Sequence, residues 1–148
     1  MKVKTTISYL MVAFLIIASS SFVMAQSDDY KEGSVWTITM VRTKPGMSDE
    51  YLKSIKSTLK LINDEAVKQG LILSYKVMQG PSANQDDWNI MLMEEFKNLA
   101  ATEGHDDQWK AIKEKVLGGA DSEKKLMQSR LDIREILGDK MMREVIFK

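Results

Sequence analysis

Few residues of this chain could carry proton-transfer chemistry, because it has one histidine and no cysteine. His105 is a candidate general base or haem ligand. The alternative is a surface residue at the start of a helix, with Asp106 or Asp107 as the cap. Tyr75 and Lys76, on a predicted strand, are further candidates for deprotonating a substrate. No second catalytic group lies near His105 in the sequence, so the structural interpretation is favoured there.

A second group of side chains could bind a ligand, because polar and aromatic groups on half-buried strands need partners. An apolar lining would use Trp36, Tyr75, Trp88 and Met91. The polar candidates are Arg42, Asn89 and Arg143. The two arginines could lie side by side on neighbouring strands and bind an anion. Alternatively, they pair with Glu94 or Glu144 and only stabilise the fold.

No metal site and no cofactor are expected. Met91 and Met93 share a strand face, and thioether sulfur can hold Cu(I), but no histidine or cysteine is adjacent, so packing is favoured. The aspartate pairs at 28–29, 86–87 and 106–107 fall in turns or caps and lack the ligand spacing of a calcium loop.

Residues 1–25 have the pattern of a cleavable signal peptide. Lys2 and Lys4 precede an apolar run over residues 7–17, and small residues lead to a cleavage bond between Ala25 and Gln26. The apolar run is shorter than the roughly 20 residues that a membrane span needs. We therefore expect a periplasmic or secreted protein with no stable membrane anchor after cleavage.

The composition of the mature chain limits its partners. Cleavage removes Lys2 and Lys4 and no acidic residue, which leaves a formal charge of −2. Nucleic acid is not expected as a partner, because phosphate binding needs clustered positive charge. We expect a polar leader over residues 26–33 and a single domain over residues 34–148.

Periodicity predicts the order strand, helix, strand, strand, helical region, strand. Strands are expected at 34–42, 71–78, 88–94 and 141–147. A helix of about 20 residues begins at Ser48 and ends before Gly70. Shorter helical pieces follow Phe96, and the last stops near Gly138. This order is that of an α+β protein, the ferredoxin-like split βαβ plait, with a four-stranded antiparallel sheet and its helices on one face.

Both faces of the predicted strands are largely apolar, which a sheet with one solvated face would not show. Something must cover the face that the helices leave free. A second copy of the domain, packed sheet against sheet, is the simplest cover, so a homodimer is expected.

Three segments resemble the dimeric α/β-barrel proteins of the ferredoxin-like superfamily. They are residues 35–52, which include Pro45-Gly46, residues 88–98, where a strand leads into a helix, and residues 134–146. The nearest resemblance is to exported bacterial proteins of unassigned function. More distant relatives include cofactor-independent monooxygenases of the antibiotic-biosynthesis type, haem-degrading monooxygenases and small-molecule-binding proteins.

Three functions remain open at this point, and they differ in whether the chain is an enzyme. The first is an exported dimeric barrel that binds a small, largely apolar molecule, either between helices and sheet or between the two sheets. The second is a monooxygenase-like enzyme that needs no cofactor. The third is a non-catalytic dimerisation module of the cell envelope.

Overall fold

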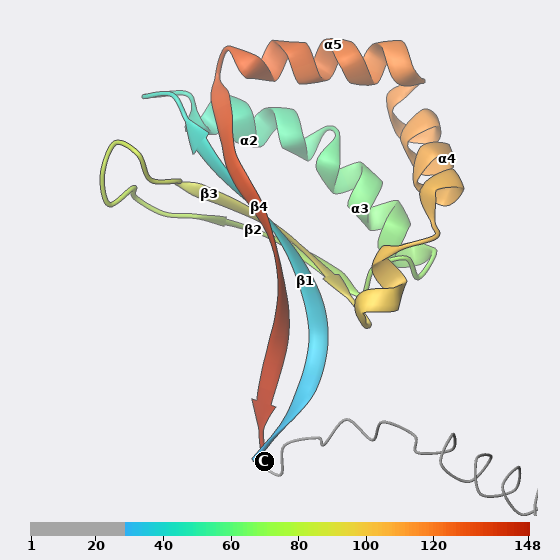
Figure 1. Cartoon of the computed structure of the whole chain (residues 1–148). Helices are drawn as coiled ribbons and strands as arrows, with labels where there is room; N and C mark the ends of the chain where they lie inside the picture. Colours follow the sequence, from blue (N-terminus) through green and yellow to red (C-terminus); the bar gives the residue numbers. More distant parts are fainter. Residues whose placement is uncertain (1–28) are drawn as a thin grey trace, which may run out of the picture. The chain divides into compact units, whose positions relative to one another are not determined.

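A computed structural model of the chain describes residues 29–148 (Figure 1). The predicted signal peptide and the bond between Ala25 and Gln26 lie outside the described residues. Residues 32–147 form one compact unit. The elements follow in the order β1 (Tyr30–Thr43), α2 (Ser48–Lys56), α3 (Leu59–Lys68), β2 (Ser74–Gln79), β3 (Ile90–Phe96), the 3-10 helix η1 (Leu99–Thr102), α4 (Asp106–Leu117), α5 (Ala120–Leu131) and β4 (Arg134–Phe147).

The four strands form one sheet in the order β2-β3-β1-β4. β3 pairs antiparallel with both β1 and β2, with Val35 opposite Phe96 and Ser74 opposite Glu95. The first and second strands are therefore separated by the third, as in a split βαβ plait. The predicted ferredoxin-like α+β fold is confirmed.

The helices pack on one face of this sheet (Figure 1). Two clusters of buried residues lie under them. One contains Val35, Ala66, Leu71, Ile72, Phe96 and Ile112, and the other contains Val41, Tyr51, Ile55 and Ile90. Both clusters use the same face of β1, because residues 35 and 41 differ by an even number along the strand. Thr37 and Thr39 lie between the clusters on that face, so the centre of the helix-covered face carries polar side chains.

The periodicity predicted one long helix after Ser48, and this prediction is wrong because the segment forms two helices. α2 ends at Lys56, and α3 begins at Leu59. The Ser57 and Thr58 hydroxyls both donate to the Ser54 carbonyl, at 2.9 and 3.0 Å, and replace the helical hydrogen bonds there. Arg130 donates to the same carbonyl from α5, at 3.1 Å. The break is therefore held by a side chain distant in the sequence.

The end of the chain also differs from the prediction. α5 ends at Leu131 rather than near Gly138, and β4 begins at Arg134 rather than at residue 141. The apolar spacing of residues 133–137 suits either a helix or a strand, and pairing with β1 selects the strand. The same pairing makes a strand of residues 30–33, which lie within the expected polar leader. Among the described residues, no helix is long and apolar enough to cross a membrane.

Candidate ligand-binding cavity

A cavity of about 460 Å³ lies between the helices and the sheet of the described unit. Its apolar wall comes from α3, β3, α4 and α5, and includes Leu59, Ile62, Phe96, Trp109, Leu117, Leu126 and Met127. The polar side chains that line it include Thr58, Asn63, Glu94 and Arg130. Asp106, Lys113 and Glu123 line both this cavity and a neighbouring depression over α4 and α5, so they mark its opening. Lys113 and Glu123 form an ion pair there at 2.9 Å.

Glu94 is the acidic group that β3 presents to the cavity. It stands opposite Thr37 on β1, and Thr37 Oγ1 donates to Glu94 Oε2 at 3.5 Å. Burial raises the pKa of Glu94 above its usual range, and the hydrogen bonds from Asn63 and Thr37 and the charge of Lys113 oppose this only in part. Glu94 therefore keeps its proton to a higher pH than an exposed glutamate.

Asn63 supplies a second polar group from α3, and only 2% of its surface is exposed. It occupies a position that the apolar stripe of α3 would otherwise fill, three or four residues from Leu59 and Ala66. Its side chain is hydrogen bonded to Glu94. Since buried amides without partners are costly, this contact fixes both the amide and the carboxyl group.

Arg130 lies in the last turn of α5 and also lines the cavity. Its Nε donates to Ser54 Oγ at 2.8 Å, and its Nη2 donates to the Ser54 carbonyl and to Thr58 Oγ1. The cavity therefore combines an apolar wall with an acidic group from the sheet and a cationic group from α5. Such a lining can hold a small apolar molecule and orient its polar groups.

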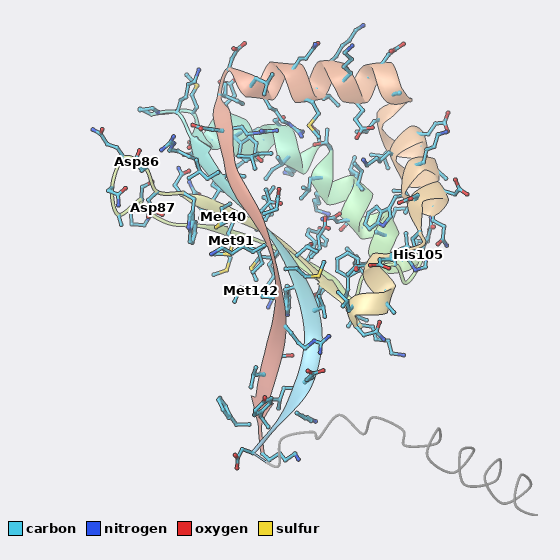
Figure 2. The ribbon with its side chains drawn as sticks, in the orientation of Figure 1. Met40, Asp86, Asp87, Met91, His105 and Met142 are labelled. Carbon is cyan, nitrogen blue, oxygen red and sulfur yellow. The ribbon has the colours of Figure 1, made fainter. Side chains whose placement is uncertain are left out.

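The predicted lining residues Trp36 and Met91 lie on the other face of the sheet, which the helices leave uncovered. Met91 stands opposite Met40, and the two are neighbours in Figure 2. Trp36 is covered in part by Lys76, whose Nζ lies 4.8 Å from the centre of the indole ring. These residues do not meet the cavity under the helices.

Tyr75 faces the helices but lies outside the 460 Å³ cavity. It lines a separate hollow of about 250 Å³ with Leu52 and Val77. Its hydroxyl donates to Asp64 Oδ1 at 2.7 Å. Burial and this bond raise the pKa of Tyr75, so the phenol is a poor base near neutral pH.

Arg42 and Asn89 come together in a second, open cavity of about 1090 Å³ at the other end of the sheet. Arg42 Nη2 binds Glu135 at 2.7 Å, and Arg42 Nη1 donates to the Gln85 carbonyl at 2.6 Å. Asn89 donates to the Thr43 hydroxyl at 2.7 Å and ties β3 to the end of β1.

Arg143 lies far from Arg42 along the β1–β4 pair. It binds Glu32 near the start of β1, whereas Arg42 meets Glu135 near the other end of that strand. The expectation that the two arginines lie side by side is therefore wrong. Their partners also differ from the expected Glu94 and Glu144, because strand register decides which charges meet.

His105 precedes α4, at the opposite end of the molecule from the Asp86–Asp87 loop (Figure 2). Its Nδ1 is hydrogen bonded to Gln108 Oε1 at 2.7 Å, and its carbonyl accepts from the Trp109 amide. Trp88 is half-buried just before β3. Neither lines the 460 Å³ or the 1090 Å³ cavity. The structure therefore does not bring His105, Tyr75 and Lys76 together in one site.

Asn63 and Arg130 were not predicted as cavity residues, whereas Glu94 was expected to pair with an arginine or to meet a ligand. A signal for both missed residues is present in the sequence. Asn63 interrupts the apolar stripe of α3, and Arg130 follows Leu126 and Met127 at helical spacing. Within residues 29–148, no three or more His, Asp or Glu side chains are grouped so that they could hold a metal ion.

No family model and no curated protein matches the chain. Solved structures do resemble it. A NIPSNAP-family protein of unknown function from Agrobacterium tumefaciens is 16% identical, with a TM-score of 0.49, over 83% of this chain and 96% of that one. A protein from Shewanella oneidensis is 18% identical, with a TM-score of 0.48, over 80% and 99%. A dimeric ferredoxin-like protein from an uncultured marine organism is 13% identical, with a TM-score of 0.47, over 80% and 90%. The fold assignment itself comes from the sheet order and strand pairing of this chain.

Proposed function

We propose that this chain is an exported homodimeric protein that binds a small, largely apolar molecule in the 460 Å³ cavity between its helices and its sheet. The cavity is the observation that carries the proposal. Its volume is within the range of small-molecule sites, roughly 300–1,000 Å³. Its wall is mostly aliphatic and aromatic, and a few polar groups converge on it.

The cavity interrupts the core at the point where the core would otherwise be continuous. Thr37, Asn63 and Glu94 separate the two buried clusters, although apolar side chains at these positions would pack more closely. A core that contains buried polar groups and an unfilled apolar space is less stable than a fully packed apolar core. A ligand that fills the space and meets these groups would offset that cost.

The homodimer is proposed from the uncovered face of the sheet. Trp36, Ile38 and Met40 on β1 and Met91 and Met93 on β3 form its apolar centre. Lys76 and Glu95 flank this centre with opposite charges. In a dimer with a two-fold axis, Lys76 of one copy can therefore lie beside Glu95 of the other copy. A contiguous apolar patch of this kind is typical of an interface.

Native mass spectrometry of the mature protein, purified from an exporting host, tests the binding proposal, with Leu126→Trp as the variant. The larger ring would fill the cavity, so the variant should lose bound mass that the wild-type protein carries. Leu99→Trp is the matched control, because it adds the same ring at an exposed position of η1 outside the cavity. If Leu126→Trp retains the same bound mass as Leu99→Trp, the ligand lies elsewhere and the proposal is wrong.

A further inference from the structure

Two arginines are buried together where α5 leads into β4. Only 7% of Arg130 and 8% of Arg134 is exposed. Their charges are close enough that the charge of Arg134 lowers the pKa of Arg130, in addition to the larger effect of burial. Each side chain ends in a guanidinium, so two positive charges are buried together here.

Neither of these charges is in an ion pair within the described part of the chain. Among residues 29–148, the ion pairs within 4.0 Å involve neither Arg130 nor Arg134. Within residues 29–148, the hydrogen bonds of Arg130 go to the Ser54 hydroxyl, the Ser54 carbonyl and the Thr58 hydroxyl. Arg134 contacts the Tyr51 phenol and, at 3.9 Å, the Met127 sulfur.

The hydrogen-bonding capacity of both side chains is also incompletely used. Arg134 Nε is buried and has no hydrogen-bond partner among the residues that the structure describes. Arg130 uses its Nε and Nη2, and within residues 29–148 no hydrogen bond occupies its Nη1. Because Arg130 lines the cavity, Nη1 is the group available to a ligand there. Buried charges are normally paired, so such an arrangement is costly without an occupant.

The phenol and the helix ends that contact the two arginines do not balance their two positive charges. Burial raises the pKa of Tyr51, so this phenol is neutral at neutral pH. The carboxyl ends of α2 and α5 both lie here, and each contributes about half a negative charge. Two guanidinium groups against two helix ends leave about one uncompensated positive charge.

We propose that the ligand of the cavity is an apolar molecule with a single anionic headgroup, which binds Arg130 while its apolar body lies along Trp109 and Leu126. This inference rests on the proposed function of the cavity. The headgroup receives hydrogen bonds from Arg130 Nη1 and is further attracted by the charge of Arg134.

A headgroup series on the wild-type mature protein tests this inference directly. Decanoate, decanol and decylammonium share one apolar chain and differ in charge, and isothermal titration calorimetry at pH 7.5 measures their dissociation constants. We expect decanoate to bind at least about tenfold more tightly than the other two, because a hydrogen-bonded charge pair supplies at least that much. If decanol or decylammonium binds as tightly as decanoate, the inference is wrong and the proposed cavity remains.

Arg130→Gln provides the second readout, and Arg143→Gln, which removes the same charge from a surface ion pair, is its control. We expect decanoate and decanol to bind Arg130→Gln equally, while Arg143→Gln retains the preference for decanoate. A retained preference in Arg130→Gln would overturn the inference. If Arg130→Gln does not fold, the wild-type series alone decides. Failure of all three compounds to bind the wild-type protein, with no bound mass lost in Leu126→Trp, would contradict the proposed function itself.

Discussion

Thr37 and Glu94 stand directly opposite each other on β1 and β3, and the threonine hydroxyl donates to the carboxyl group beneath the helices. This pair lies between two apolar clusters, where a sheet covered by helices ordinarily continues its core. The cavity exists because the core is interrupted here, and the interruption leaves an ionisable group beside an apolar wall.

Glu94→Gln should change how stability depends on pH. The raised pKa means that the folded chain holds this proton more tightly than the unfolded chain. The resulting stabilisation is present below the ordinary glutamate range and is lost as pH rises through the folded-state pKa. Relative to the wild-type protein, Glu94→Gln should therefore gain stability in urea unfolding as the pH rises above the ordinary glutamate range, near pH 4.

Glu95→Gln is the matched control for this experiment and should show the opposite sign. The hydrogen bond from Ser74 is the largest of the effects that lower the pKa of Glu95, so its contribution to stability is present at neutral pH and lost as pH falls. The difference between wild-type protein and Glu95→Gln should therefore be constant above the ordinary glutamate range, near pH 4, and should shrink as pH falls below it. Parallel curves for the two variants would contradict the environments described for them.

Thr58→Val should destabilise the protein by about 1–2 kcal/mol, because it removes a hydroxyl that bonds both the Ser54 carbonyl and buried Arg130. Ser57→Ala removes the neighbouring exposed hydroxyl, which donates to the same carbonyl. Its effect should stay within about 0.5 kcal/mol. Equal losses in chemical denaturation would show that Arg130 does not hold the break between α2 and α3.

Met91→Lys should convert the proposed dimer to a monomer. It places a charge at the apolar centre of the uncovered face, and the dissociation constant of the dimer should rise at least about a hundredfold. Leu61→Lys, an exposed position on α3, is the control and should leave the dimer intact. Light scattering after size-exclusion chromatography measures both. A dimeric Met91→Lys would show that the interface lies elsewhere.

Gly33→Ala should weaken the pairing of β1 with β4. A Cβ at this position would lie 2.6 Å from Glu144 Oε2 and 2.9 Å from Glu144 Cβ, both closer than real contacts. The expected loss is about 1–2 kcal/mol in thermal or urea unfolding. Gly80→Ala, where a Cβ meets nothing within 4 Å, should cause no comparable loss. Restoration of stability in Gly33→Ala/Glu144→Gly would identify Glu144 as the clashing partner.

If residues 1–25 are a cleaved signal peptide, the mature protein should begin at Gln26. Amino-terminal sequencing of protein recovered from outside the cytoplasm should read Gln-Ser-Asp-Asp-Tyr. Ala25→Arg should block cleavage, because signal peptidase requires a small residue there, and should leave an unprocessed precursor. A protein recovered with its Met1 terminus intact would contradict the signal peptide.

The sequence was sufficient for the element order and hence for the plait. Alternation in residues 34–42 and the apolar stripe after Ser48 each reflect one local repeat, and a local repeat can be read without knowing what the segment contacts. The sequence was insufficient where the same pattern is compatible with two secondary structures. Residues 134–140 became a strand because β1 lay beside them, and the helix broke at Ser57 and Thr58 where Arg130 could reach the carbonyl of Ser54.

The candidate site could not be predicted from the sequence, because its residues come together only in the tertiary structure. The single histidine, the lack of cysteine and the apolar strand faces are properties of the chain itself, and they limited the chemistry before any folding was known. The meeting of Glu94 with Asn63, and the burial of Arg130 beside Arg134, join elements distant in the sequence. Only packing and strand register decide such meetings, because side chains in contact there follow no sequence period.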